Sequence, residues 1–412
     1  MGARLATACC ICGGGPAGMM LGLLLARAGV DVIVLEKHAD FLRDFRGDTI
    51  HPSTLEVLHE LDMLDAFLAE PHQKVHRVAG VVGGIATPIA DFSRLPVRCR
   101  FIAFVPQWNF LDFIARQGAR YPAFHLRMAC AAVGLAVRDG RVAGVRARAA
   151  DGGTLDIDAD LVVAADGRES RLRAEAGLSV RDIGAPIDAL WFKLPRRAAD
   201  PPGVMGRFDA GRVMVTLDRG DYWQCAYIIP KGGFERLREA GLPAFHAGVA
   251  AIAPDLADRV GDVRSWDDVS LLRVRVDRLR TWHRPGLLCL GDAAHAMSPL
   301  GGVGINLAIQ DAVAAANILA QPLRRGTVAA SHLHAVQRRR MWPTRATQAL
   351  QVAAQNRLLR PMLEATTRPG PPLPLRLLRR SAWLRRLMGR LIGLGFRPEH
   401  VATPVAGVPP TG

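Results

Sequence analysis

The chain has 412 residues, of which 50% are hydrophobic and 22% are charged. This composition excludes a disordered chain, and the length allows two or more domains with large cores. The net charge is +15, and the segment 338–397, with fourteen arginines and one glutamate, accounts for most of it. The seven cysteines show no disulfide framework. Cys9 and Cys12 make a C-x-x-C, but on a predicted strand they would point to opposite faces and could share neither a disulfide nor a metal, which favours reduced, buried thiols in a cytoplasmic protein.

The first apolar stretch, residues 5–26, contains no charged side chain and is long enough to span a bilayer. It could therefore be a signal peptide, a membrane anchor or a buried nucleotide-binding unit. The run GGGP at 13–16 lies near its centre and would break a spanning helix. A second strand-like run, VDVIVLE, follows directly, with no signal-peptide cleavage site between them. The pattern favours the nucleotide-binding unit.

Strand, Gly13-x-Gly15-x-x-Gly18, helix, strand and the acid Glu36 follow one another in the order of a dinucleotide-binding unit. Gly13 would make the tight turn, Gly15 would let the backbone approach a pyrophosphate, and Gly18 would let the helix pack closely on the strand. The helix N-terminus would supply free N–H groups to the phosphates, and Glu36 would accept hydrogen bonds from ribose hydroxyls. The predicted site also includes the neighbours Ala17 and Lys37.

The next part of the chain alternates between helices and strands. Ser53 and Glu56 have the spacing of a capping box and predict the start of a helix. Short apolar runs with many breakers occupy 73–97, and 101–119 is typical of a strand that enters a helix. Residues 141–173 predict a hairpin with a DGG turn, then a strand that ends in a tight DG turn.

Alternating apolar residues predict an antiparallel sheet over 181–269, and 285–319 reads as a strand, a loop and a long alanine-rich helix. The remaining chain is helical with proline breaks. We expect the first strand, the strand that ends in DG and the strand that ends in GD to share one parallel sheet. A β-rich segment would then be inserted into a discontinuous nucleotide-binding domain.

The basic segment leaves three interpretations open. Residues 375–394 read as an amphipathic helix with one face formed by Leu377, Leu384, Leu387 and Leu391. The helix could contact nucleic acid, dock weakly on an anionic membrane surface, or pack on the protein itself. No nucleic-acid recognition motif accompanies it, so we expect no nucleic-acid partner. We expect packing on the protein, with weak membrane-surface contact as the alternative.

Three motifs together resemble the flavin-dependent aromatic hydroxylases, which are typified by para-hydroxybenzoate hydroxylase and the ubiquinone-biosynthesis hydroxylases. They are GGGPAG with Glu36, AADGRESRLR at 164–173, and GDAAHAMSPLGGVGINLAIQDA at 291–312. The resemblance covers roughly residues 5–320. It implies an α/β fold in which a discontinuous Rossmann-like FAD-binding domain of the GR2 type carries an inserted antiparallel substrate domain and a C-terminal helical region. The expected boundaries are 1–72, 98–180 and 270–330 for the first, 73–97 and 181–269 for the second, and 331–412 for the third.

The resemblance also implies roles for residues of the motifs. Asp292 would accept a hydrogen bond from a ribityl hydroxyl of FAD, and Asp166 with Gly167 would lie near the FAD pyrophosphate. Arg46, with Arg43 as a rival, would reach the ribose and phosphate region, and Gln107 matches a glutamine at the cofactor. The loop before the long helix would keep side chains away from the isoalloxazine and direct helix N–H groups at it. Its residues are Pro299, Gly301, Gly302, Gly304, Ile305 and Asn306.

The implied reaction is a monooxygenation. NAD(P)H would reduce the flavin transiently, O2 would form a flavin C4a-hydroperoxide, and a small aromatic or polyketide-like substrate would be hydroxylated or epoxidised. Side chains of 181–269 and of the region around 73–104 would select the substrate. The candidates are Trp191, Trp223, Tyr222 and Tyr227, although bulky strand residues are more often core. Tyr222 or Tyr227 could help to deprotonate a phenol. No other catalytic side chain and no metal ligands are indicated.

Two alternatives share this fold. Flavin-dependent halogenases carry a W-x-W-x-I-P motif; here DYWQCAYIIP ends in Ile229-Pro230, but Cys225 and Tyr227 replace the two tryptophans. We therefore disfavour a halogenase. A flavin dehydrogenase or reductase of isoprenoids would act without inserting oxygen, and labelled O2 distinguishes it from a monooxygenase.

Overall fold

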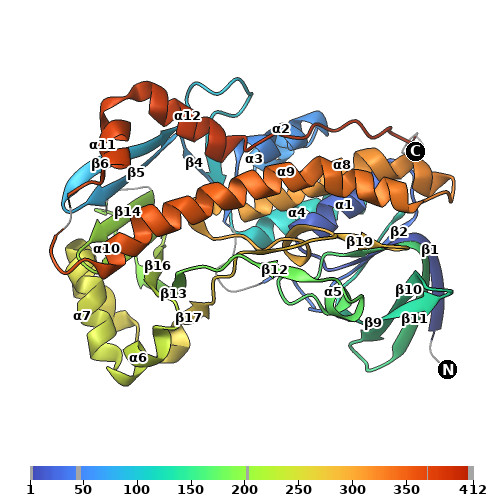
Figure 1. Ribbon diagram of the computed structural model, residues 1–412, viewed down its shortest axis with the longest axis horizontal. Helices are drawn as coiled ribbons and strands as arrows, with labels where there is room; N and C mark the ends of the chain where they lie inside the picture. The colour runs from blue at the N-terminus through green and yellow to red at the C-terminus, as the bar shows by residue number, and fades with distance from the viewer. Residues whose placement is uncertain (1–2, 43–47, 201–203, 369, 407–412) are drawn as a thin grey trace.

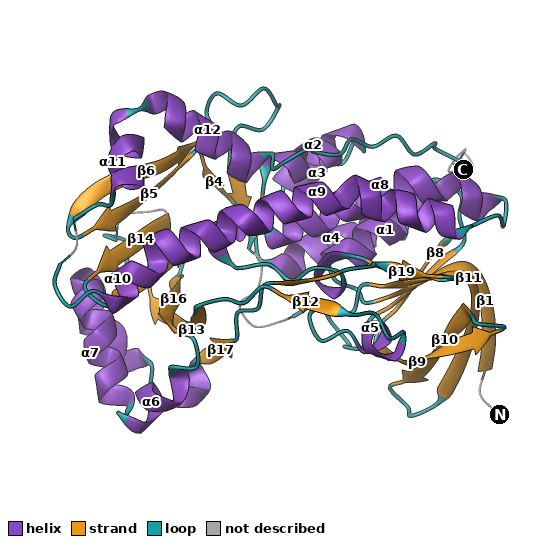
Figure 2. Ribbon diagram, viewed as in Figure 1, coloured by secondary structure: helices purple, strands orange, loops and turns teal. Residues whose placement is uncertain are grey.

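Two large β-sheets, two small ones and the helices that cover them make up the part of the chain that the structure describes (Figure 1). The computed structural model describes residues 3–42, 48–200, 204–368 and 370–406. The long helix α9 (Ala330–Ala354) runs across the molecule beside both large sheets, and the chain combines helices with parallel and antiparallel strands, as expected for an α/β protein with an inserted antiparallel sheet (Figure 2).

The first sheet has the strand order β19-β20-β11-β1-β2-β8, with β10 and β9 added to one side of β11. Its strands are β1 (Ala3–Cys12), β2 (Val32–Leu35), β8 (Phe124–Arg127), β9 (Cys130–Arg138), β10 (Arg141–Ala149), β11 (Thr154–Ala164), β19 (His283–Arg284) and β20 (Leu287–Cys289). β1 is parallel to β2 and β11, and β11 is parallel to β20. The expected parallel sheet, with the DG and GD segments after neighbouring strands, is confirmed.

Helices α1 (Pro16–Arg27), α4 (Gln107–Gly118) and α8 (Gly304–Arg324) pack together beside this sheet. All positions of α1 from Ala17 to Ala26 are buried, because the helix lies between the sheet and other helices. One helical stretch of the described residues, Leu300–Arg324, is long and apolar enough to cross a membrane, but 78% of its apolar window is buried inside the protein. It is a core helix here.

Helix α2 (Pro52–Glu60) begins one residue before the expected cap. His51 occupies the N-cap position, and no side chain caps the helix. The capping box predicted at Ser53 and Glu56 is therefore wrong, because Pro52, whose missing N–H needs no partner, already opens the first turn. The short helices α3 (Leu64–Leu68) and α5 (Arg171–Glu175) complete this part of the chain.

The second sheet has the order β17-β13-β16-β15-β14-β5-β6. Its strands are β5 (Arg77–Val82), β6 (Ile85–Asp91), β13 (Ile187–Pro195), β14 (Val204–Asp209), β15 (Arg212–Asp218), β16 (Tyr222–Pro230) and β17 (Ser270–Leu272). Neighbouring strands are antiparallel except β14 and β5, which are parallel. The helices α6 (Phe234–Glu239) and α7 (Leu242–Ile252) and the 3-10 segment η1 (Pro254–Asp262) follow β16 in the chain, and α7 covers one face of the sheet.

Two small sheets join the parts of the molecule. One consists of β3 (Thr49–Ile50), β7 (Ile102–Phe104) and β4 (Gln73–Val75), and the other of β12 (Val180–Asp182) and β18 (Asp277–Leu279). The domain boundaries stay a prediction, although β17 already extends the second sheet past residue 269.

The C-terminal region continues from α9 through a π-helical turn, η5 (Gln355–Leu359), to α10 (Arg360–Glu364), α11 (Leu373–Arg380) and α12 (Ala382–Gly393). The single helix expected over 375–394 is wrong. Ser381 has an extended backbone (φ −117°, ψ 111°), and its hydroxyl accepts a hydrogen bond from the Leu384 N–H at 3.3 Å. This N-cap starts a new helix after α11.

Candidate active site

The three glycines of the first motif have different surroundings. Gly13 has φ +118°, and a Cβ there would collide with the carbonyl oxygen of Ala165. A Cβ on Gly18 would collide with the carbonyl oxygen of Gly13, whereas a Cβ on Gly15 would meet no atom within 4 Å. Gly13 and Gly18 thus serve the packing of the chain itself. Gly15 faces open space at the N-terminus of α1, where a pyrophosphate fits.

Glu36 lies at the end of β2, beside this loop, and is 8% exposed. Its two carboxylate oxygens accept hydrogen bonds from the backbone N–H groups of Gly14 and His38, both at 3.0 Å. These bonds fix the carboxylate beside the glycine turn, at the position where the dinucleotide fingerprint places the acid that meets the ribose. Lys37, next in the chain, is exposed.

The second and third motifs meet through an ion pair that the sequence did not predict. The Arg168 Nε donates to the Asp292 carboxylate at 2.8 Å. Within the described residues, Arg168 Nη1 and Asp166 Oδ1 are buried without a hydrogen-bond partner. Gly167, between them, has φ +89° and open space where a Cβ would be. Buried polar atoms without partners beside open space are what a bound polar ligand would satisfy.

A second arginine of the same motif fixes the geometry behind that pair. Arg173 is buried and donates to the carbonyl oxygens of Ala293 at 3.1 Å and Arg168 at 2.7 Å. It thereby joins the turn after β11 to the 3-10 turn η3 (Gly291–Ala293) after β20. The Arg168–Asp292 ion pair could have been suspected from the sequence, because Arg168 directly follows the Asp166-Gly167 pair of the second motif.

The loop that leads into α8 is folded tightly. Gly301 (φ +80°) and Gly302 (φ +64°) lie in the 3-10 turn η4 (Leu300–Gly302), which Pro299 precedes as N-cap. The Thr49 hydroxyl donates to the Gly302 carbonyl at 2.9 Å, and a Cβ on Gly302 would collide with that hydroxyl. Gly304 then opens α8, whose first N–H groups have no partner within the helix.

Asn306, which we expected at the cofactor, uses its side chain inside the protein. Its Oδ1 accepts hydrogen bonds from the His51 N–H and the Thr54 hydroxyl, both at 2.8 Å, and its Nδ2 donates to the Thr49 carbonyl at 3.1 Å. The side chain holds α8 against the start of α2. Any contact of Asn306 or of its buried neighbour Ile305 with FAD would come from their backbone N–H groups.

Three glutamines of the C-terminal helices support the loop from behind. We call Gln348, Gln351 and Gln355 the glutamine ladder; they are 1%, 5% and 0% exposed. Gln348 Nε2 donates to the carbonyls of Asp277 (2.7 Å) and Ala296 (3.0 Å).

Gln351 makes three bonds to the loop. Its Nε2 donates to the carbonyls of Ser298 and Leu300, both at 2.9 Å, and its Oε1 accepts from the Ser298 N–H at 3.2 Å. Gln355 Nε2 donates to the Ser298 hydroxyl at 2.6 Å, at the start of the π-helical turn. Sequence analysis missed this ladder.

The substrate candidates divide between two faces of the second sheet. Trp223 and Tyr227 point to the face that α7 covers, which we call the outer face. Tyr227 packs edge-on against Phe245 of α7, with 5.9 Å between the ring centroids. Burial raises the pKa of the Tyr227 phenol. Tyr227 is therefore a core residue that lies away from the FAD-binding domain, which argues against the catalytic role considered for it.

Trp191 and Tyr222 belong to the inner face, which points toward the FAD-binding domain. Trp191 packs with an apolar cluster to which Leu300 also belongs. Leu300 lies in the loop 297–303 before α8, which we call the flavin loop. The indole Nε1 of Trp191 is buried without a partner among the described residues. Burial raises the pKa of Tyr222, and the Lys193 ammonium lies 4.9 Å from the centroid of its ring.

The inner face also carries a buried polar contact between the two domains. Gln224 donates to the Asp48 carboxylate at 2.6 Å, Arg219 forms an ion pair with the same carboxylate at 2.5 Å, and the Arg219 Nε donates to the Gln224 Oε1 at 2.9 Å. Arg46 and Arg43 lie outside the described residues. Gln107 is half-buried at the first turn of α4.

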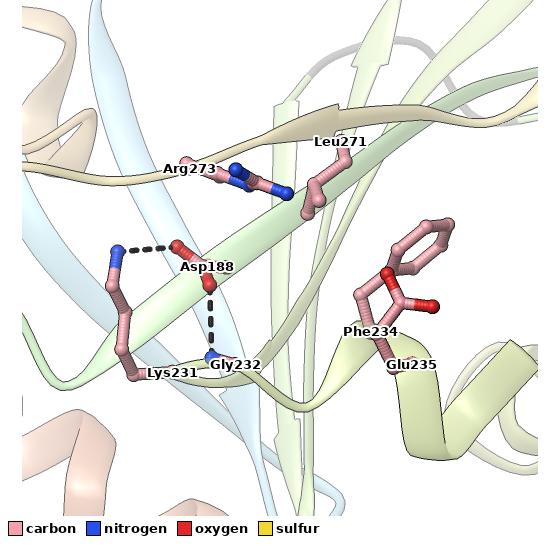
Figure 3. Close-up of a pocket in the computed structure, with 7 residues that line it drawn as sticks. All are labelled: Asp188, Lys231, Gly232, Phe234, Glu235, Leu271 and Arg273. Atoms are coloured by element: carbon pink, nitrogen blue, oxygen red, sulfur yellow. Dashed lines mark hydrogen bonds and ion pairs between the residues drawn. The ribbon is translucent and has the colours of Figure 1, made fainter.

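A surface pocket of about 250 Å³ lies beside α6, across the molecule from α1 (Figures 1 and 3). Asp188 in its wall accepts hydrogen bonds from Lys231 Nζ (2.8 Å), the Val274 N–H (2.8 Å) and the Gly232 N–H (3.0 Å). Through these three bonds the Asp188 carboxylate of β13 holds the turn after β16 and the segment after β17 together, which is a structural role. In the described part of the chain, no group of three or more His, Cys, Asp or Glu side chains could hold a metal ion.

Comparisons with known proteins agree with the three motifs. Residues 6–350 match the FAD binding domain family. The 6-methylpretetramide 4-monooxygenase of Streptomyces rimosus is 34% identical over 353 residues, which are 85% of this chain and 84% of that protein. A rifampicin monooxygenase of Streptomyces venezuelae is 29% identical over 73% of this chain and 61% of its own length.

Solved structures show the same fold. The anhydrotetracycline hydroxylase of Streptomyces rimosus has a TM-score of 0.76 at 22% identity and covers 96% of this chain and 77% of its own. A p-nitrophenol 4-monooxygenase of Pseudomonas putida has a TM-score of 0.75 at 19% identity, over 95% and 97% of the two chains. The fold and the cradle of glycines and unpartnered polar atoms define a flavoprotein oxidoreductase. The chain belongs to the FAD binding domain family of aromatic hydroxylases; it is an FAD-dependent monooxygenase.

Proposed function

We propose that the enzyme inserts one oxygen atom of O2 into a small aromatic or polyketide-like substrate held between the flavin loop, residues 297–303, and the inner face of the second sheet. One observation carries the proposal. The apolar cluster of the inner face includes Leu300 of the loop. In the same cluster, the indole N–H of Trp191 is buried and has no partner among the described residues, so it can donate to a bound substrate. A flat apolar molecule with a phenol or keto oxygen matches such a surface.

The parts of the chain have separate tasks in this reaction. FAD, reduced by NAD(P)H, supplies the chemistry that activates oxygen. Gly15, Glu36 and Arg168 would hold its adenosine and pyrophosphate side, and the glutamine ladder would keep the flavin loop in place. The inner face would exclude water and orient the ring, with Trp191 Nε1 donating a hydrogen bond to a substrate oxygen.

The relatives support the substrate class. Their names include monooxygenases for 6-methylpretetramide and rifampicin and a hydroxylase for aklavinone, which are aromatic or polyketide compounds. Halogenases also occur among solved structures of this fold, at 17% and 16% identity. We also propose a cytoplasmic location, because all seven cysteines are free and buried, as is usual in a reducing compartment.

The test is NADH and NADPH oxidation in air with a panel of phenols and hydroxylated polycyclic aromatics, followed by mass spectrometry of products made under labelled O2. We expect one substrate to accelerate oxidation and to gain a labelled oxygen. Product without label would contradict the proposal and favour a dehydrogenase or reductase. A chlorinated product from chloride, O2 and reduced flavin would favour a halogenase.

A matched pair of variants tests the placement of the substrate. Trp191→Phe removes the inner-face donor and keeps an aromatic ring, so KM should rise while FAD binding stays unchanged. Tyr227→Phe, on the outer face, should leave KM and kcat unchanged. Equal effects of the two substitutions would contradict substrate binding at the inner face.

A further inference from the structure

Helices α11 and α12 carry the same surface pattern. In each, large apolar residues stand at positions i and i+4 and arginines at i+3 and i+7: Leu373, Arg376, Leu377 and Arg380 in α11, and Trp383, Arg386, Leu387 and Arg390 in α12. Residues three and four apart share one helix face. The four apolar side chains are exposed by 68%, 49%, 65% and 37%, in chain order.

The opposite sides of both helices are packed on the protein. α11 buries Leu375, and α12 packs Gly389 against strand β6, where a Cβ on Gly389 would collide with the Asp91 carbonyl. Both helices contact β6, so their exposed faces point away from the second sheet, at the upper left edge of Figure 1. Arg385 fixes the pair by donating to the carbonyls of Leu378 (2.7 Å) and Arg379 (3.1 Å).

The charge of this surface has one sign. Between Glu364 and Glu399 the sequence contains eight arginines and no acidic residue. Among the described residues, Arg380 and Arg390 have no ion pair within 4.0 Å, and Arg386 has only a longer-range interaction with the Asp91 carboxylate, whose pKa it helps to lower. Exposed leucines and a tryptophan beside unpaired cations make up the composition of an interfacial amphipathic helix.

We propose that the exposed faces of α11 and α12 dock on an anionic lipid bilayer, with Trp383 and the leucines at the acyl boundary and the arginines at the headgroups. A second copy of the same surface would meet it with like charge, which disfavours self-association. Nucleic acid would use the arginines, but three leucines and one aromatic residue offer it no stacking platform. An anionic bilayer matches both the charge and the apolar side chains.

Docking would bring the proposed substrate chamber close to a bilayer in which an apolar substrate dissolves. The inward side of α12, through Met388, Ile392 and Leu394, belongs to the apolar cluster that also contains Trp191 and Val215 of the inner face. This apolar cluster therefore extends from the packed side of α12 to the proposed substrate chamber. This consequence rests on the proposed function, whereas the docking itself does not.

The experiment is flotation of the full-length FAD-loaded protein with vesicles of phosphatidylcholine alone or mixed with phosphatidylglycerol. We expect binding to the anionic vesicles only, weakened by salt. Arg386→Gln with Arg390→Gln should lower the partition coefficient on the order of five-fold for each arginine removed. Trp383→Ser with Leu387→Ser should abolish the binding that survives high salt. Turnover of a water-soluble phenol should not change in either variant.

Matched controls keep the inference open to refutation. Leu42→Ser and Val137→Ser remove apolar side chains that are 62% and 49% exposed elsewhere, and Arg148→Gln removes an exposed arginine; binding should not change. Three results would overturn the proposal: no binding of the wild type, equal loss in the controls, or wild-type binding by both double variants. A change of mass in solution caused by the Trp383 and Leu387 substitutions would assign the surface to a second copy instead.

Discussion

Replacement of Gln351 by leucine tests whether the flavin loop depends on the glutamine ladder. The substitution keeps the size of the side chain and the helix propensity of α9. It removes three hydrogen bonds and leaves the Ser298 N–H and the carbonyls of Ser298 and Leu300 without their partners. The affected groups belong to the segment that precedes the first turn of α8.

The magnitude follows from the number of orphaned groups. Each buried polar group without a partner costs about 1–3 kcal/mol, so three such groups strongly destabilise the folded position of the loop. We therefore expect the loop to leave its position in the apoprotein, which lets water reach the groups. FAD binding must then order the loop again. A cost of about 3 kcal/mol would raise the Kd for FAD about 100-fold.

The assay is titration of the apoprotein with FAD, followed by quenching of flavin fluorescence, with thermal unfolding of the apoprotein in parallel. Gln321→Leu, at an exposed position of α8, is the matched control and should bind FAD as the wild type does. Wild-type affinity for FAD in Gln351→Leu would refute the reasoning. An equal loss of affinity in the control would refute it as well.

Other predictions concern the cofactor cradle and its surroundings. Gly15→Val should abolish FAD binding and leave the Tm of the apoprotein unchanged, because a Cβ at Gly15 meets no protein atom. Gly18→Ala should lower the Tm of the apoprotein, because its Cβ would collide with the Gly13 carbonyl. Calorimetry and flavin titration distinguish the two effects. Asp292→Ala should sharply reduce FAD retention on gel filtration, and Arg168→Ala should do the same, since each breaks the half-buried ion pair that joins the second and third motifs; wild-type flavin content in both variants would contradict the assignment. Burial lowers the pKa of His51 to about 4, whereas the pKa in the unfolded chain is about 6.5. Between these two pH values the unfolded state binds a proton that the folded state does not bind. The free energy of unfolding therefore falls as the pH drops from 6.5 to 4. His51→Asn should flatten this dependence by about 3 kcal/mol in denaturant titrations across that pH range, and an unchanged slope would assign the acid sensitivity to other groups.

The sequence allowed the cofactor side of the fold to be predicted because its signals are local. Gly13, Gly15, Gly18 and Glu36 belong to one β-α-β unit, and their spacing follows from the geometry of a turn and a helix. The motifs at 164–173 and 291–312 each follow an apolar run that could be recognised as a strand. Their meeting in space then follows from the shared parallel sheet.

The remaining features depend on partners that are distant in sequence. The glutamine ladder contacts backbone carbonyls between 51 and 71 residues away, and nothing in its own sequence distinguishes it from an exposed helix face. Tyr222 and Tyr227 are five residues apart, so the period of a strand predicts opposite faces; only the packing of α7 shows which face is the inner one. The apolar spacing over 375–394 predicted one continuous helix. The chain instead forms two helices, because the Ser381 hydroxyl caps the N-terminus of α12.

The position of the glutamine ladder also has a consequence for the order of events during synthesis. β1 pairs with β11 about 150 residues later, and β11 pairs with β20 more than 120 residues further on. The loop that follows β20 then receives its supports from Gln348, Gln351 and Gln355. At about 5–20 residues per second, ribosomes need several seconds to make the segment between loop and ladder. Until then the nascent chain has its adenosine cradle but no fixed flavin loop, so firm capture of FAD is a late step of biogenesis.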